Sequence, residues 1–325
     1  MKEQIDMRAW MWEPGKKENG YIEVPGTDIQ LPITLICGEK PGPTLLITGG
    51  IHSAEYVGIV AAMELGREIL PEQLAGSLIV MPVVNRTGFE HRTMSMVFED
   101  GKNLNRVFPG NPHGTAADKI AYFLSEEIQK RADYYVDLHC GDGYEILTPY
   151  VYCIGKGKTD VTAKSREMAQ AVNVPWLVIS DIASGGAYNH AGSMGIPSIL
   201  IERGCLGCWS KEEVKKDKED VLNILRFLGM MEGDAQSFEK NQDVMEKVYY
   251  PQAMETGCWY PEKNIGEIVG KGELLGTIRD YFGTNLDKIY AAEDGIILYQ
   301  VMSLCVLKGG VTVAYGAVPA EKRME

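Results

Sequence analysis

The sequence predicts an α/β protein with a doubly wound, largely parallel sheet, followed by a small all-β domain. Three observations lead to this prediction. Short apolar runs alternate with helical segments over residues 40–230, a pattern typical of a sheet covered by helices on both faces. Polar residues follow several of these runs, as expected at the carboxyl ends of parallel strands. From residue 247 onward, short β-like runs alternate with glycine turns and no long helical period appears.

The first part of the chain contains strands and helices in alternation. Buried strands read as short apolar runs, and amphipathic helices repeat apolar residues every three or four positions. The predicted elements are strands at 33–37, 44–48 and 77–84 and helices at 56–70 and 115–130. Residues 86–114 are polar and poorly periodic, so we expect a long loop there, and loops of this length are usually functional.

Residues 134–228 continue the same alternation. The predicted strands are 134–138, 150–154, 176–180 and 197–202, and the predicted helices are 159–172, 187–194 and 211–228. Ser210 is expected to cap the last helix, because Glu213 three residues later completes a capping box.

The pattern changes near residues 231–234, which predicts a larger domain at 1–235 and a small all-β domain at 240–325. Residues 269–278 and 289–297 resemble the lipoyl or biotinyl carrier fold, a barrel sandwich. Carriers present a modified lysine at a hairpin tip, but the corresponding turn at 280–285 has no lysine and Lys288 lies past it. A structural or site-capping role is therefore the better interpretation.

Composition restricts the possible partners and location. The net charge is −13, which disfavours nucleic acid as a partner. The N-terminus has no signal-like apolar core, and no apolar run is long enough to span a membrane. The seven cysteines form no regular framework, so we expect reduced thiols in a cytoplasmic protein.

His52 and Glu55 follow the apolar run 44–48 and lie three residues apart. This spacing puts an imidazole and a carboxylate on one face if the chain turns helically there, so both can reach one metal ion. Catalytic zinc takes three protein ligands, and two histidines with one glutamate is a known set. His139, at the end of the run 134–138, is the candidate third ligand. Taken alone, the His-Glu pair is more often a solvated helix face, and His139 a hydrogen-bonded core histidine.

His52, Asn85, His139 and Glu202 each follow or finish a predicted strand. Functional groups gather at this edge of a doubly wound sheet, which favours one common site. The alternative for Glu202 is an ion pair with its neighbour Arg203.

Four sequence blocks then resemble the succinylglutamate desuccinylase/aspartoacylase family. They are residues 52–55 (HSAE), 103–106 (NLNR), 137–139 (DLH) and 201–204 (IERG), in the family's order. The resemblance covers about residues 30–230 and extends to the terminal β domain. It implies a catalytic domain with the doubly wound mixed sheet of the zinc carboxypeptidases, one Zn²⁺ per chain bound by His52, Glu55 and His139, and Glu202 as general base.

The same resemblance implies residues that hold the substrate. Asn105 and Arg106 match the pair that binds a substrate carboxylate. Arg92 matches the arginine that polarises the scissile carbonyl, with Arg86 as the fallback. The alternatives are a turn asparagine beside a surface arginine for the pair, and a plain surface charge for Arg92.

These observations favour a zinc-dependent deacylase, an amidohydrolase acting on a small N-acyl amino acid or related acylated amine. A metallocarboxypeptidase cleaving C-terminal residues is the second hypothesis, but the interval between Glu55 and His139 resembles the deacylases. A non-catalytic small-molecule binding protein on the same fold is the third, and it would be expected to lack a ligand or the base. A homo-oligomer is compatible with the sequence.

Overall fold

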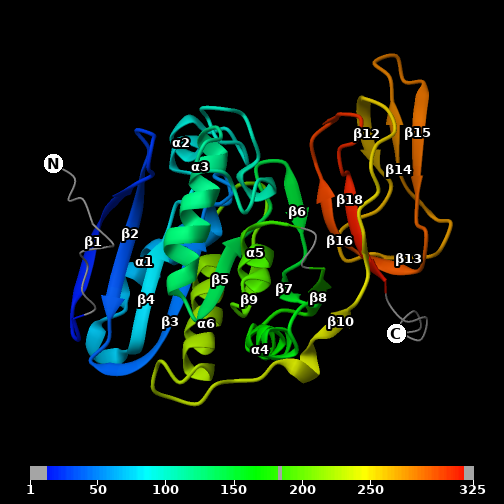
Figure 1. Cartoon of the computed structure of the whole chain (residues 1–325). Coiled ribbons are helices and arrows are strands. Elements are labelled where there is room, and N and C mark those ends of the chain that lie inside the picture. Colours follow the sequence, from blue (N-terminus) through cyan, green and yellow to red (C-terminus); the bar gives the residue numbers. More distant parts are fainter. Residues whose placement is uncertain (1–12, 182–184, 318–325) are drawn as a thin grey trace.

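A computed structural model describes residues 13–181 and 185–317 (Figure 1). A nine-stranded mixed sheet runs through residues 17–245, with the strand order β1-β2-β4-β3-β5-β9-β7-β8-β10. Its strands are β1 (Lys17–Glu23), β2 (Gln30–Cys37), β3 (Lys40–Gly49), β4 (Ala75–Met81), β5 (Tyr134–His139), β7 (Tyr150–Ile154), β8 (Trp176–Ser180), β9 (Ser198–Glu202) and β10 (Asp243–Met245). Strands β3, β4, β5 and β9 are mutually parallel, whereas β7 runs antiparallel to β9.

Helices cover both faces of this sheet, as the sequence predicts. They are α1 (Tyr56–Glu68), α3 (Ala116–Phe123), α4 (Thr159–Gln170), α5 (Ala187–Ser193) and α6 (Lys211–Phe227), and a further short helix, α2 (Arg86–His91), follows β4 along the chain. Neighbouring residues of β3 belong to different apolar cores, one on each face of the sheet. Leu45 lies in the core that includes Val57 of α1. Leu46 lies in the core that includes Ile120 of α3. Successive strand residues point to opposite faces, so a run that is apolar throughout needs a helix layer on each side.

Residues 86–114 differ from the predicted loop, because they contain the short helix α2 and a 3-10 turn at Leu104–Arg106. Asn85 caps α2, since its side chain accepts a hydrogen bond from the backbone N–H of Gly88 at 3.2 Å. A six-residue helix is too short to display an apolar period, which explains why the sequence does not reveal it. The predicted helix 115–130 is also not α-helical throughout. The α-helix α3 ends at Phe123, and the chain continues as a π-helical turn at Leu124–Ile128.

All regular elements described after Asp243 are strands. They are β11 (Val248–Tyr249), β12 (Gly257–Pro261), β13 (Ile268–Val269), β14 (Leu274–Arg279), β15 (Asn285–Tyr290), β16 (Gly295–Val301), β17 (Cys305–Val306) and β18 (Val313–Ala317). They form two sheets, ordered β11-β18-β16-β13 and β15-β14-β12-β17. Strand β6 (Glu145–Leu147), from the connection between β5 and β7, pairs antiparallel with β16 (Figure 1). This pairing joins the C-terminal strands to the main sheet close to the end of β5.

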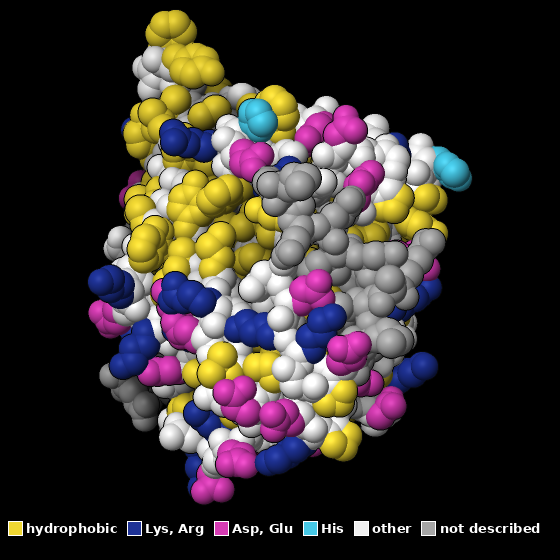
Figure 2. Space-filling model, turned by 90° about the vertical axis from the view of Figure 1, so that its left-hand side faces the viewer, with side chains coloured by type: hydrophobic (Ala, Val, Ile, Leu, Met, Phe, Trp, Pro, Cys, Tyr) yellow, Lys and Arg dark blue, Asp and Glu magenta, His cyan; other side chains and the backbone are white. Residues whose placement is uncertain are grey.

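The face of the molecule on the side of β1 and β2 carries both positive and negative charges. There, basic and acidic side chains lie beside one another, and apolar side chains gather in the upper half of the view (Figure 2). Among the described helices, none is long and apolar enough to cross a bilayer. All seven cysteines are free, in agreement with the reduced thiols expected from the sequence.

Candidate metal centre and substrate cavity

The ends of three neighbouring strands position the candidate residues. His139 is the last residue of β5 and is paired in register with Glu202, the last residue of β9. His52 and Glu55 lie in the short connection from β3 to α1. A Cβ on Gly58 would lie only 2.7 Å from the carbonyl oxygen of Leu138, so glycine is what lets α1 approach β5 closely just before His139.

His52, Glu55 and His139 converge, as the sequence predicts. The Nδ1 atom of His52 lies 2.7 Å from Oε1 of Glu55, and Nδ1 of His139 lies 2.7 Å from Oε2 of the same carboxylate. One potential ligand atom from each of the three residues lies within 4.8 Å of the others. Burial alone would raise the pKa of Glu55, but the two adjacent imidazoles outweigh it and lower this pKa to about 2. The carboxylate is therefore ionised and available as a ligand.

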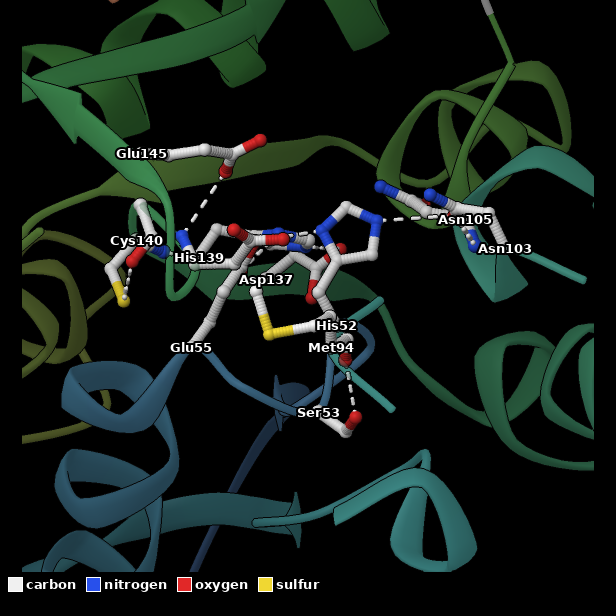
Figure 3. A network of polar contacts seen from close by, with 12 residues as sticks. His52, Ser53, Glu55, Met94, Asn103, Asn105, Asp137, His139, Cys140 and Glu145 are labelled. Atoms are coloured by element: carbon white, nitrogen blue, oxygen red, sulfur yellow. Dashed lines mark hydrogen bonds and ion pairs between the residues drawn. The ribbon is translucent and has the colours of Figure 1, made fainter. Parts of the chain in front are cut away.

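Outer partners hold both imidazoles in place (Figure 3). The Nε2 atom of His52 lies 3.2 Å from Oδ1 of Asn103, and Nε2 of His139 forms an ion-pair contact of 3.1 Å with Oδ2 of Asp137. Asp137 is itself anchored, because its Oδ1 accepts a hydrogen bond from the Thr48 hydroxyl at 2.6 Å. Each ring therefore directs Nδ1 toward the Glu55 carboxylate, an arrangement typical of metal-binding histidines.

The donor set fits a zinc ion. Two imidazole nitrogens and one carboxylate oxygen are the ligands of a catalytic three-residue zinc site, which leaves a fourth position for water or substrate. Both Glu55 and His139 are almost fully buried, with exposed fractions of 3% and 1%. A divalent cation bound there would neutralise a carboxylate that is otherwise costly to bury.

A cavity of about 210 Å³ opens beside this cluster. It is lined by His52, Glu55, Ser95, Asn103, Arg106, Cys140, Asp142, Glu145, Leu147, Tyr150, Tyr152, Glu202, Tyr250, Tyr299 and Val311. Three of these residues, Tyr250, Tyr299 and Val311, belong to the C-terminal strands and the segments between them. The C-terminal region thus forms part of the cavity wall.

Glu202 lines the same cavity. Its Oε2 atom is buried and has no hydrogen-bond partner among the described residues. Burial, reinforced by the nearby Glu55, raises the pKa of the Glu202 carboxyl well above its usual range. The alternative ion pair with Arg203 is wrong, because the Arg203 guanidinium instead contacts Asp220 at 2.5 Å.

Arg106 lines the cavity, but its neighbour Asn105 does not. Asn105 is buried, and its Oδ1 accepts a hydrogen bond from the backbone N–H of Ala187 at 2.8 Å. Its own backbone N–H donates to Oδ1 of Asn103 at 2.9 Å. Asn105 therefore connects the 3-10 turn that contains Arg106 to the start of α5. A role of Asn105 toward the substrate stays a prediction.

Neither candidate for the carbonyl-polarising arginine is among the cavity-lining residues. Arg92 is exposed at the C-terminal cap of α2, with a φ of 58°. The Arg86 guanidinium lies 3.6 Å from the Glu90 carboxylate and 5.7 Å from the centre of the Tyr21 ring. The assignment of Arg92 stays a prediction.

Several cavity residues are not evident from the sequence patterns. Asp142 and Glu145 lie in a turn and a three-residue strand, and Tyr250 and Tyr299 lie far along the chain. Asp137 had a usable signal, since strand residues two positions apart point to the same face and place it beside His139.

The model of the succinylglutamate desuccinylase/aspartoacylase catalytic domain matches residues 41–228. This chain belongs to that family. All residues of the metal cluster, Glu202 and Arg106 lie inside the matched segment. The four sequence blocks that carry the resemblance are therefore explained by family membership.

Individual relatives of this family member share about a quarter of its sequence. The N-alpha-acetyl-L-2,4-diaminobutyric acid deacetylase of Halomonas elongata is 27% identical over 86% of this chain and 85% of its own length. The succinylglutamate desuccinylase/aspartoacylase from Rhodobacter sphaeroides has a TM-score of 0.82 at 27% identity, covering 93% and 95% of the two chains. The product-bound ectoine utilization protein EutE (DoeB) from Ruegeria pomeroyi has a TM-score of 0.83 at 26% identity, covering 95% and 98%. Relatives in this family are named as a desuccinylase and a deacetylase, which supports a hydrolase.

Proposed function

We propose that this protein is a zinc-dependent deacylase that hydrolyses the amide bond of a small N-acyl amino acid. The observation that carries the proposal is the convergence of His52, Glu55 and His139 beside a cavity that Glu202 and Arg106 also line. The names of the deacetylase and desuccinylase relatives support acylated amino acids as the substrate class. We expect one zinc ion per chain.

His52, Glu55 and His139 would hold the zinc ion, which would polarise the substrate carbonyl and lower the pKa of water at the site to about 7. The carboxylate of Glu202 would accept the proton of the attacking water and deliver it to the leaving nitrogen. The raised pKa of Glu202 suits this exchange, because a carboxyl that holds a proton readily can also return it to the amine. Asp137 and Asn103 would keep the two histidine rings oriented during the reaction.

Arg106 would bind the carboxylate of the substrate. Its planar guanidinium can donate two parallel charge-assisted hydrogen bonds, and it is the one lysine or arginine among the described residues that line the cavity. Asn105 would add a donor beside it. Arg92 would reach the developing oxyanion only if the segment after α2 moves toward the cavity when substrate binds.

The size of the cavity favours deacylation over peptide cleavage. A volume of about 210 Å³ suits one acylated amino acid better than a peptide chain. The C-terminal region limits the size of the cavity, because Tyr250 and Tyr299 form part of its wall. We therefore place a zinc carboxypeptidase-like catalytic domain at 1–235 and a β domain of the barrel-sandwich kind at 240–325 that limits access. The free cysteines support a cytoplasmic location.

The test measures how fast zinc-loaded protein hydrolyses a panel of N-acetyl and N-succinyl amino acids, and compares these rates with the rates for C-terminal dipeptides. We expect one zinc per chain by metal analysis and turnover of the acylated amino acids only. Metal binding without any hydrolysis would favour a binding protein, and dipeptide cleavage would favour a carboxypeptidase.

A further inference from the structure

Two of the seven cysteines lie directly opposite each other in the C-terminal strands. Strand β12 pairs antiparallel with β17, and in this register Cys258 is the partner of Cys305. Among the strand pairs of the described residues, no other register places two cysteines opposite each other. The deacylase reaction proposed above uses neither thiol, so the pair needs an explanation of its own.

The backbone spacing at this pair suits a disulfide. The backbone N–H of Trp259 donates to the carbonyl oxygen of Leu304 at 2.7 Å, one residue further along each strand. Because ladder hydrogen bonds alternate along antiparallel strands, Cys258 and Cys305 form a non-hydrogen-bonded pair. In such a pair the opposite Cα atoms lie about 4.5 Å apart and the side chains are closest. Disulfide-bonded cysteines have Cα atoms about 4.4 to 6.8 Å apart, so the strands need little movement to form the bond.

Both thiols lie on the outer face of their sheet. The next residue of each strand, Trp259 in β12 and Val306 in β17, is buried in the C-terminal apolar core. Successive strand residues point to opposite faces, and accordingly Cys258 is only partly buried and Cys305 is exposed. Free cysteine is among the residue types most often found buried, so core packing does not explain this pair. A small oxidant can reach it from solvent.

Strand β17 is weakly held and lies close to the cavity wall along the chain. It is the edge strand of its sheet and contains two residues, so few ladder hydrogen bonds fix it. Just before it, the backbone N–H of Met302 donates to the carbonyl oxygen of Tyr144 at 2.6 Å. Just after it, the chain reaches Val311, which lines the cavity. A covalent bond from β12 to β17 would therefore fix a segment that leads into the cavity wall.

We infer that Cys258 and Cys305 are a redox modification site and form a reversible disulfide by exchange with a low-molecular-weight disulfide such as oxidised glutathione. Cys305 attacks first because it is the more exposed, so its sulfur bonds to one glutathione sulfur and the other glutathione leaves as a thiol. The Cys258 sulfur then displaces the second glutathione from Cys305. The two protons of the protein thiols pass to the released thiols, and one molecule of oxidised glutathione is reduced for each protein disulfide formed.

The experiment treats native full-length protein with oxidised glutathione, counts thiols after denaturation and identifies linked peptides by mass spectrometry. We expect two of the seven thiols to disappear, a link between Cys258 and Cys305 without retained glutathione, and reversal by dithiothreitol. Retention of all seven thiols, a stable glutathione adduct, or a link between Cys205 and Cys208 instead would overturn the inference.

Thermal unfolding of the oxidised protein tests the effect on the C-terminal strands. The midpoint should rise by about 5 °C or more, because the bond closes the long loop from β12 to β17 in the unfolded chain and fixes the edge strand in the folded one. An unchanged or lower midpoint in the oxidised protein would contradict a stabilising role.

Single variants test the order of attack. After the same treatment, Cys258→Ser should carry a glutathione adduct on Cys305, whereas Cys305→Ser should carry about fivefold less on the partly buried Cys258. Neither variant should gain thermal stability. Cys208→Ser, which alters an exposed cysteine outside the strands, is the matched control and should behave like wild type. Equal adducts in the two variants would contradict the order, and a stability gain in either would contradict this disulfide as its source.

None of these measurements requires hydrolysis of a substrate. Failure of the deacylase assay would therefore leave the test of the cysteine pair intact, and failure of the cysteine pair would leave the proposed function untouched.

Discussion

Asp217 on α6 provides a stability prediction whose size follows from the structure. Its side chain is fully buried, and neither carboxyl oxygen has a hydrogen-bond partner among the described residues. The nearby Arg203 is already paired with Asp220, so one guanidinium serves two buried carboxyl groups. Burial raises the pKa of Asp217 to about 8, although Arg203 opposes the shift. Replacement by asparagine keeps the shape of the side chain and removes the charge.

The direction of the effect follows from proton binding. Asp217 loses its proton near pH 3.9 in the unfolded chain but only near pH 8 in the folded protein. Between these values the folded state binds more protons, so this group lowers the free energy of unfolding as the pH rises, by up to about 1.4 kcal/mol per pH unit. From pH 5 to pH 8 the loss approaches about 4 kcal/mol, and Asp217→Asn should abolish it.

The assay is urea unfolding of wild type and Asp217→Asn at several pH values between 5 and 8.5, with equal zinc content. The midpoint of the variant should exceed that of wild type by an amount that grows with pH and levels off above about pH 8. Glu219→Gln, on the exposed part of the same helix, is the matched control and should show no such trend. A difference that stays constant with pH, or a variant that is less stable at pH 8, would refute the reasoning.

Three further predictions concern the site. Glu202→Ala should keep one zinc per chain by metal analysis but lower kcat by about 100-fold or more, because the proton acceptor is lost, and near-normal turnover would contradict the role of the base. Arg106→Ala should raise KM for carboxylate-bearing substrates by about tenfold with a smaller effect on kcat, since a ground-state contact is removed, so an unchanged KM would count against the contact. Asp137→Asn should weaken zinc binding by about 10- to 100-fold in competition with a chelator, because the partner of His139 loses its charge, and unaltered affinity would argue against this support.

Local spacing explains why the metal cluster could be predicted from the sequence. His52 and Glu55 are three residues apart just after one apolar run, and His139 follows another. Predicting the position of each residue therefore requires only that the strand before it is predicted correctly. The register of β5 with β9 then brings Glu202 beside His139. The two helix layers were also predictable, because apolar runs such as 44–48 need burial on both faces.

Positions within the polar segment 86–114 could not be predicted in the same way. Arg92 and Asn105 were assigned by resemblance, yet the structure places the first at an exposed helix cap and buries the second against the start of α5. The conformation of this segment depends on side-chain to backbone hydrogen bonds, such as that from Gly88 to Asn85, which leave no periodic pattern.

Sequence alone therefore determined the alternation of strands and long helices, and it singled out His52, Glu55 and His139, because these features depend on periodicity and on short intervals along the chain. The wall of the cavity was decided by tertiary structure. Glu145 meets Tyr299 only because β6 pairs with β16, and 154 residues separate the two partners. No local pattern encodes a contact between residues so far apart, since it arises from the packing of the C-terminal strands against the end of the main sheet.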